Sequence, residues 1–225
     1  MRHYPAFLNL SACSCLVVGA GAVGLRKITT LLSAGPREIC VLDLGEASKE
    51  LLDLCASPSL HFEQREFDES DLKGRTLVFA CTNNAKVNSH IAELCQKHGT
   101  LCNIADAPDK STFIVPASLK RGALVLALST GGASPAVSRR IRMELEKALG
   151  PEYEPFVAIM GRLRPLILNL GLPTAQNTTL FRQLALGPLP EALRENDMLR
   201  VRDLLSEALP PQLHSHIGEL LDGIE

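Results

Sequence analysis

The sequence lacks three features: an excess of charge of one sign, a long hydrophobic run and an export signal. Its 225 residues carry 23 lysines and arginines against 25 aspartates and glutamates, a net charge of −2. This balance gives no overall electrostatic reason to expect binding to nucleic acid or to a membrane surface. No apolar run is as long as a membrane span, and residues 1–5 lack the apolar core of a signal peptide. We therefore expect a cytoplasmic protein that binds neither nucleic acid nor a membrane.

The sequence also lacks a paired pattern of cysteines. Its seven cysteines are an odd number, and several lie inside apolar runs, where a free thiol behaves as a small buried hydrophobe. Cys13 and Cys15 are spaced like half of a metal site, but no second pair with metal-ligand spacing follows. His214 and His216 point in different directions if they lie on a helix. We expect reduced thiols and no resident metal.

What the sequence does contain is a glycine-rich motif between a strand pattern and a helix pattern. An apolar run at residues 15–18 leads into Gly19-x-Gly21-x-x-Gly24, and Asp43 ends a second apolar run. In this context the glycines permit a tight turn, a close approach of the backbone to a pyrophosphate, and packing of the helix on the strand. A carboxylate at Asp43 would accept hydrogen bonds from ribose hydroxyls and repel a 2′-phosphate, which favours NAD over NADP. The alternative is an ordinary glycine turn.

Apolar runs alternate with helical patterns through the first half of the chain, at residues 15–18, 38–42, 61–65, 76–81 and 101–104. This alternation predicts an α/β fold, a doubly wound parallel sheet of the Rossmann type. In such a sheet the ligand crevice lies beyond the carboxyl ends of the strands, where Gly19, Asp43, Thr82 and Asp106 fall. The residues predicted to bind NAD are Gly19, Gly21, Ala22, Val23, Gly24, Asp43, Leu44, Thr82, Asn83 and Asn103.

The pattern changes after residue 112. Short strands predicted at 113–115 and 123–128 indicate a hairpin or small sheet, and Ser134-Pro135 starts a helix that runs to about residue 149. The helix has an apolar stripe that we expect to be buried, and the chain reads as helical from residue 150 onward. The apolar surface of residues 112–149 exceeds what one small segment can bury, which predicts a homodimer. We therefore divide the chain into an NAD-binding domain (1–112), a dimerisation segment (113–150) and a helical C-terminal domain (151–225).

Several further motifs accompany the glycine-rich loop: Arg26-Lys27, Asn103-Ile104-Ala105-Asp106-Ala107-Pro108, Phe113-Ile114-x-Pro116 and Ser129-Thr130-Gly131-Gly132-x-Ser134-Pro135. With them the chain resembles the precorrin-2 dehydrogenase/sirohydrochlorin ferrochelatase family, the dehydrogenase–chelatase module of siroheme synthase. The resemblance is strong over about residues 1–150. The rest of the chain resembles the family only in its general helical character. The resemblance implies an intertwined homodimer and NAD-dependent oxidation of precorrin-2 to sirohydrochlorin. In many members the same site then inserts a divalent metal, iron or cobalt.

The resemblance also implies roles for particular residues. The essential aspartate of the family falls on Asp106, where a carboxylate beside the nicotinamide can act as a general base. From the residues alone, a cap on the following turn is an equal alternative. The tetrapyrrole substrate carries many carboxylates and needs guanidinium partners, although a solvated helix face is the alternative for these arginines. The residues predicted to bind substrate are Ser129, Thr130, Gly131, Gly132, Ser134, Arg139 and Arg140. In one branch of the family a serine that can be phosphorylated stands at the position of Thr130, and we do not carry that regulation over to this chain.

Two other functions fit part of the sequence. A regulatory domain that senses NAD without catalysis explains residues 15–43 equally well, but not the Asp-Ala-Pro and Ser-Thr-Gly-Gly segments. A dehydrogenase for another small substrate explains the cofactor site, but no histidine or lysine is placed as its acid–base partner.

Overall fold

The computed structural model describes residues 3–105 and 107–224. The chain divides into two compact units, and the boundary along the sequence lies between Val115 and Pro116. In the part of the chain that the structure describes, we find no helix with the length and apolar character needed to cross a membrane.

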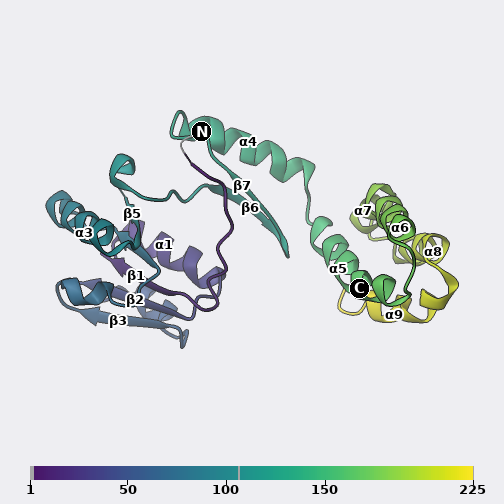
Figure 1. Ribbon diagram of the computed structural model, residues 1–225, viewed down its shortest axis with the longest axis horizontal. Coiled ribbons are helices and arrows are strands. Elements are labelled where there is room, and N and C mark those ends of the chain that lie inside the picture. The colour runs from purple at the N-terminus through teal and green to yellow at the C-terminus, as the bar shows by residue number, and fades with distance from the viewer. Residues whose placement is uncertain (1–2, 106, 225) are drawn as a thin grey trace. The chain divides into compact units, whose positions relative to one another are not determined.

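The first unit is built on a five-stranded parallel sheet in the order β3-β2-β1-β4-β5 (Figure 1). The strands are β1 (Ser14–Val18), β2 (Glu38–Asp43), β3 (Leu60–Gln64), β4 (Leu77–Ala80) and β5 (Leu101–Ile104). The segments between and after them hold α1 (Ala22–Ser33), α2 (Lys49–Leu54), α3 (Ala85–His98) and the 3₁₀ turns η1 (Glu69–Leu72) and η2 (Pro108–Lys110). The strand order reverses at β1, so the predicted Rossmann-type α/β fold is confirmed.

Alternate residues of the strands supply the two faces of this sheet. Cys15 and Val17 of β1 pack into the cluster that contains α1 and α2, whereas Leu16 and Val18 pack with α3 and η1. Every residue of β1 is buried, as expected for a parallel strand covered on both faces. This double coverage explains the continuous apolar run in the sequence.

The second unit starts with an antiparallel hairpin of β6 (Ala117–Arg121) and β7 (Leu124–Leu128), followed by α4 (Pro135–Ala148). The remaining elements are α5 (Tyr153–Asn169), α6 (Thr174–Leu186), α7 (Leu189–Arg194), α8 (Met198–Ala208), η3 (Pro211–His216) and α9 (Ile217–Leu220). They enclose a separate core that includes the fully buried Ile159, Leu163 and Leu205. The three-part division after residues 112 and 150 stays a prediction.

The strand predicted at residues 113–115 is wrong. The segment is irregular, because its polar groups bond to β5: Asn103 Nδ2 donates to the Phe113 carbonyl (3.0 Å), and the Cys102 N–H donates to Thr112 Oγ1 (2.7 Å). The Phe113 ring packs edge-on against Phe79, with the ring centroids 5.4 Å apart. The apolar character of this segment therefore reflects its docking against the sheet.

Helix α4 begins as predicted, since Ser134 Oγ accepts a hydrogen bond from the Val137 N–H and Pro135 is the first helical residue. The expected burial of its apolar stripe does not occur within the chain. Ser138 is the one buried residue of α4, all of which the structure describes, and Val137 and Met143 are 46% and 47% exposed. Strand β7 consists of five apolar residues, and none is buried. This apolar surface lies open in the isolated chain.

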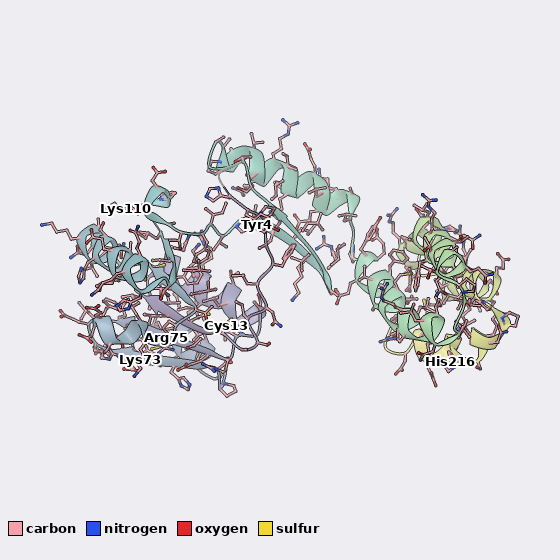
Figure 2. All side chains as sticks on the ribbon, viewed as in Figure 1. Tyr4, Cys13, Lys73, Arg75, Lys110 and His216 are labelled. Carbon is pink, nitrogen blue, oxygen red and sulfur yellow. The ribbon has the colours of Figure 1, made fainter. Side chains whose placement is uncertain are left out.

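The cysteines and histidines form no metal centre among the described residues. All seven cysteines are free, and the described chain contains no group of three or more His, Cys, Asp or Glu side chains that would hold a metal ion. Cys13 and His216 belong to different units (Figure 2). His214 Nε2 lies 2.9 Å from the Leu209 carbonyl oxygen, and His216 Nδ1 lies 3.0 Å from a carboxylate oxygen of Glu219.

Candidate functional site

A cavity of about 980 Å³ lies at the carboxyl ends of β1, β2, β3 and β4. Gly19, Asp43 and Thr82, which follow or end three different strands, all line it. The predicted cofactor residues in its wall are Gly19, Gly21, Ala22, Val23, Asp43, Leu44, Thr82 and Asn83. The structure thus brings eight of the ten predicted cofactor residues together at one edge of the sheet.

The three glycines of the motif have different surroundings. A Cβ on Gly19 would lie 2.6 Å from the Cys81 carbonyl carbon, and its φ of +97° disfavours other residues. A Cβ on Gly24 would clash with the Gly19 carbonyl oxygen. A Cβ on Gly21, by contrast, would meet no atom within 4 Å. Gly19 and Gly24 are therefore required by the loop itself, whereas the space beside Gly21 is open.

The N-terminus of α1 offers free donors to that space. Gly21 is its N-cap residue and provides no side-chain hydrogen bond, and no acidic residue lies in the first turn. The other α-helices of the first unit, α2 and α3, are capped by Ser48 and Asn84. An uncapped helix start has unpaired N–H groups and a partial positive charge, which suit a phosphate group.

Asp43 fastens the glycine-rich loop to the end of β2. Its Oδ2 accepts a hydrogen bond from the Ala20 N–H (2.6 Å), and its Oδ1 accepts one from the Gly45 N–H (2.8 Å). This positioning role was not predicted from the sequence. Each carboxylate oxygen can accept a second hydrogen bond, so the predicted bond to a ribose hydroxyl is compatible with these contacts.

The wall beyond β4 is fixed by polar side chains. The Thr82 hydroxyl donates to Asn88 Oδ1 (2.7 Å), and Asn88 Nδ2 donates back to the Thr82 carbonyl (3.0 Å). Asn84 Oδ1 accepts from the Lys86 N–H (3.0 Å) and caps α3. Because Asn88 is only 1% exposed, its hydrogen bonds with Thr82 are shielded from solvent and fix this part of the wall.

Sequence reasoning missed part of the cavity wall. The missed residues are Val18, Leu42, Gly45, Arg65, Glu66, Phe67, Cys81, Asn84, Lys86, Val87 and His90. Arg65 directly follows β3, whose Gln64 pairs with Asp43 in the parallel register. The end of the third predicted strand was therefore a usable signal. Lys86 and His90 had none, because a helix pattern does not show which of its polar residues face the crevice.

Two predicted cofactor residues, Gly24 and Asn103, are not among the described residues of this cavity wall. Gly24 is buried behind the loop, where it packs α1 against Gly19. Asn103 is 8% exposed and its amide donates to the Phe113 carbonyl, and its predicted contact with the cofactor stays a prediction. Asp106, the predicted catalytic residue, lies outside the described residues.

The predicted substrate residues belong to the second unit. The Thr130 hydroxyl donates to the Ser134 carbonyl and accepts from the Ser134 N–H, both at 3.1 Å, which closes the loop at the start of α4. Arg140 is exposed and pairs with Glu144 at 2.9 Å. Arg139 is also exposed and has no partner among the described residues.

These features fit a nicotinamide dinucleotide. A phosphate can reach the uncapped start of α1 because Gly21 has no side chain there, and the Asp43 carboxylate lies at the end of the adjacent strand.

Comparison with known proteins supports this interpretation. A family described as "Putative NAD(P)-binding" matches residues 6–117, and one described as "Sirohaem biosynthesis protein central" matches residues 121–148. Siroheme synthase of Nitrosomonas europaea is 33% identical over 210 residues, which are 93% of this chain and 44% of that protein. Siroheme synthase 1 of Halorhodospira halophila is 37% identical over 175 residues, 77% of this chain and 36% of that protein. The chain therefore spans less than half of the length of these curated relatives.

A solved structure is similar to most of the chain. The structure titled "SirC, precorrin-2 dehydrogenase" superposes with a TM-score of 0.75 at 26% sequence identity, covering 92% of this chain and 98% of that one. The predicted fold and the prediction of NAD as the cofactor are thereby confirmed. The two family matches, the siroheme synthase relatives and this structure agree with the resemblance seen in the sequence motifs. The chain belongs to the precorrin-2 dehydrogenase/sirohydrochlorin ferrochelatase family, which includes the dehydrogenase–chelatase module of siroheme synthase.

Proposed function

We propose that this protein is an NAD-dependent dehydrogenase that oxidises precorrin-2 to sirohydrochlorin in siroheme biosynthesis. The observation that carries the proposal is the cavity at the strand ends, where the open space at Gly21 meets the uncapped start of α1. The family match and the precorrin-2 dehydrogenase structure support the tetrapyrrole as its substrate.

The chemistry requires removal of a hydride and a proton from the substrate. NAD, when bound, supplies the hydride acceptor. The chain holds the dinucleotide through the α1 N–H groups and Asp43, and the bonded wall of Thr82 and Asn88 keeps the cavity shape. We assign the proton to the Asp106 carboxylate as general base, because the essential aspartate of the family motif falls on this position.

The second unit is proposed to bind the acidic side chains of the substrate. Arg139 and Arg140 follow the Gly131-Gly132 loop by one to two turns of α4. Their guanidinium groups suit carboxylates, and Arg139 is free of ion pairs within the described chain. Ser129, Thr130 and Ser134 would act through the loop shape that they maintain. A divalent metal ion, iron or cobalt, would be a second substrate if the same site also chelates.

The incubation of the protein with NAD and precorrin-2 tests the proposal. The tetrapyrrole spectrum should change to that of sirohydrochlorin while NADH absorbance rises in equal amount. An NAD-sensing domain would bind NAD and leave both spectra unchanged. A dehydrogenase for another substrate would also leave precorrin-2 and NAD unchanged, but it would reduce NAD when a different compound is supplied.

We predict that the protein binds NAD at least roughly tenfold more tightly than NADP. The Asp43 carboxylate at the end of β2 would face the charged 2′-phosphate of NADP, and like charges repel. Calorimetric titration of both dinucleotides measures the ratio. Equal affinities would contradict the assignment of Asp43 to the ribose.

We also predict a homodimer, formed largely by the hairpin and α4. The open apolar side chains of this segment, Val125, Val137 and Met143, are 41–47% exposed in the single chain. Light scattering at micromolar concentration should give twice the mass of one chain. Val137→Asp should shift the protein toward monomers, because a buried unpaired carboxylate is costly. Leu199→Asp, at a position 77% exposed on α8, is the control and should leave the dimer intact. A monomeric wild type would rule out this interface.

A further inference from the structure

Arg65 occupies an unusual position for a positive charge in a site that prefers NAD. It directly follows β3 and lines the cavity together with Asp43 and Leu44. Gln64, the last residue of β3, donates from Nε2 to the Leu44 carbonyl (3.2 Å), so the β2 and β3 ends are tied together. An arginine near the end of the second strand is the side chain that accommodates the 2′-phosphate in NADP enzymes. By position alone, Arg65 would favour NADP.

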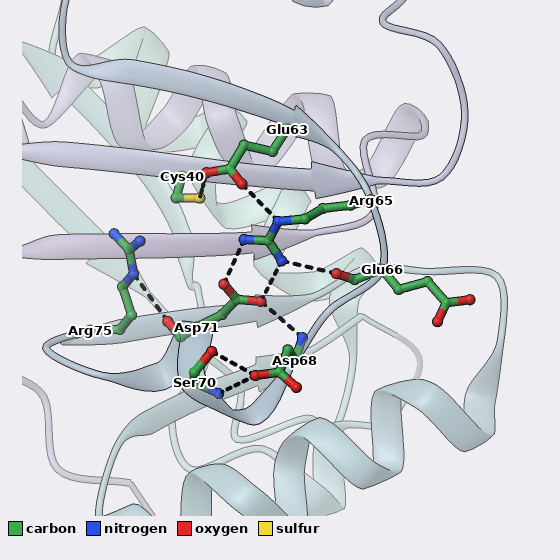
Figure 3. A network of polar contacts seen from close by, with 8 residues as sticks. All are labelled: Cys40, Glu63, Arg65, Glu66, Asp68, Ser70, Asp71 and Arg75. Atoms are coloured by element: carbon green, nitrogen blue, oxygen red, sulfur yellow. Dashed lines mark hydrogen bonds and ion pairs between the residues drawn. The ribbon is translucent and has the colours of Figure 1, made fainter.

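The guanidinium group of Arg65 is, however, already hydrogen-bonded to other residues of the protein (Figure 3). Nε donates to Glu63 Oε2 (2.7 Å), and Nη1 and Nη2 donate to the two carboxylate oxygens of Asp71 (2.8 and 2.7 Å). Nη1 also donates to the Glu66 carbonyl (3.0 Å). These bonds use all but one of the N–H donors of an arginine. The side chain can therefore not present its usual fork to a phosphate.

The partners of Arg65 are themselves held in place. Asp71 lies in η1, its side chain is 10% exposed, and its Oδ2 also accepts from the Asp68 N–H (2.9 Å). The hydrogen bonds from Arg65 hold the pKa of Asp71 below its usual range, so this partner stays ionised. A bidentate arginine–carboxylate pair adds geometric specificity to the attraction between the charges. The pair fixes Arg65 before a ligand enters.

The charges around Arg65 and in the adjoining cavity wall also disfavour binding of a 2′-phosphate. Two carboxylates, Glu63 and Asp71, bond to one guanidinium, and the cavity wall adds Asp43 and Glu66. Against these four carboxylates the described cavity wall has two cations, Arg65 and Lys86, so this part of the site is negative overall. A 2′-phosphate placed there would meet net repulsion and no free donor fork.

We propose that the Glu63–Arg65–Asp71 ion-pair network is a second determinant of the preference for NAD, because it withholds Arg65 from a 2′-phosphate. The network acts together with Asp43, which repels the phosphate directly. Releasing Arg65 should turn it into a phosphate-binding residue without any change in the glycine-rich loop. The proposal rests on the dinucleotide site of the proposed function, but not on its substrate.

The test is calorimetric titration of NAD and NADP into the full-length wild type and the Glu63→Gln/Asp71→Asn variant. Both substitutions keep the side-chain shape and remove the charges that hold Arg65. We expect NADP affinity to rise about tenfold and NAD affinity to change less than about twofold, since an arginine–phosphate pair forms only with NADP. The gain should shrink in high salt, because screening weakens the partly exposed pair.

Asp68→Asn/Glu69→Gln is the matched control. It removes two carboxylates from the same segment, and neither bonds to Arg65: Asp68 accepts from Ser70, and Glu69 pairs with Lys97. This variant should change NADP affinity less than about twofold, which separates release of Arg65 from a general change in charge. An equal gain in the control would overturn the proposal.

The remaining outcomes are also decisive. Unchanged NAD affinity in the double variant shows that the site is still formed, and unchanged NADP affinity alongside it would refute the network's role. If Asp71→Asn prevents folding, Glu63→Gln alone should still raise NADP affinity by about threefold, since it removes the negative charge that holds Nε and leaves only a weaker, neutral acceptor. If the wild type binds neither dinucleotide, the proposed function fails instead.

Discussion

Asp106→Asn should lower the rate of precorrin-2 oxidation by about 10²–10⁴-fold, the usual cost of removing a positioned general base. The amide keeps the size and hydrogen-bonding oxygen of the carboxylate but cannot accept the proton. NAD affinity should stay unchanged, because the cavity wall that holds the dinucleotide is made by the ends of β1 to β4. The measurements are the initial rate of sirohydrochlorin formation at saturating NAD and an NAD titration of the same variant.

Asp109→Asn is the matched control for this variant. It lies three residues further along the chain in η2 and removes the same charge with the same change in shape. Its rate should remain within about twofold of the wild type, as expected for a surface position. A wild-type rate in Asp106→Asn would show that this residue only caps its turn, which is the alternative that turn chemistry offers.

The Asp106→Asn variant also tests whether one carboxylate serves both oxidation and metal insertion. If Asp106 accepts protons from the pyrrole nitrogens during metal insertion, any chelatase activity should fall with the oxidation rate. Oxidation lost with full chelation would assign the two steps to different groups. Metal insertion can be followed separately by supplying sirohydrochlorin and a divalent metal without NAD.

The part of the site near the glycine-rich loop was predictable because its signals are local. Gly19, Gly24 and Asp43 lie next to apolar runs that encode the strands, and parallel strands bring their carboxyl ends to one edge. The start of α4 at Ser134 was predictable for the same reason, since its cap and its proline are adjacent in sequence.

The parts that were missed depend on pairing between distant or irregular segments. Whether Arg65 is free or bonded depends on Asp71, which is brought back toward β3 by the η1 turn. Asn103 is paired with Phe79 in β5, and its amide donates to the Phe113 carbonyl, a contact that its residue type did not indicate. The apolar run 113–115 has the composition of a strand, but β5 already supplies partners for its polar neighbours. Residue type alone does not distinguish these outcomes.

Gly21→Val should abolish dinucleotide binding while leaving the fold unchanged. The backbone of Gly21, with φ −65° and ψ −176°, is extended and open to any residue, and a Cβ there meets no protein atom within 4 Å. The valine methyl groups would therefore enter the space beside the uncapped α1 N-terminus, which we assign to the pyrophosphate. We expect NAD affinity to fall by about 100-fold or more, since the pyrophosphate cannot approach the backbone. Calorimetric titration measures this loss, and circular dichroism checks the fold.

Gly161→Val provides the matched control, because Gly161 lies in α5 of the second unit and its Cβ also meets no atom within 4 Å. It introduces the same side chain away from the cavity and should bind NAD like the wild type. Gly24→Val would be uninformative by comparison, since its side chain clashes with the Gly19 carbonyl and disturbs the loop before any ligand binds. A Gly21→Val protein that binds NAD with wild-type affinity would place the pyrophosphate elsewhere, and the α1 N-terminus would then lose its assigned role.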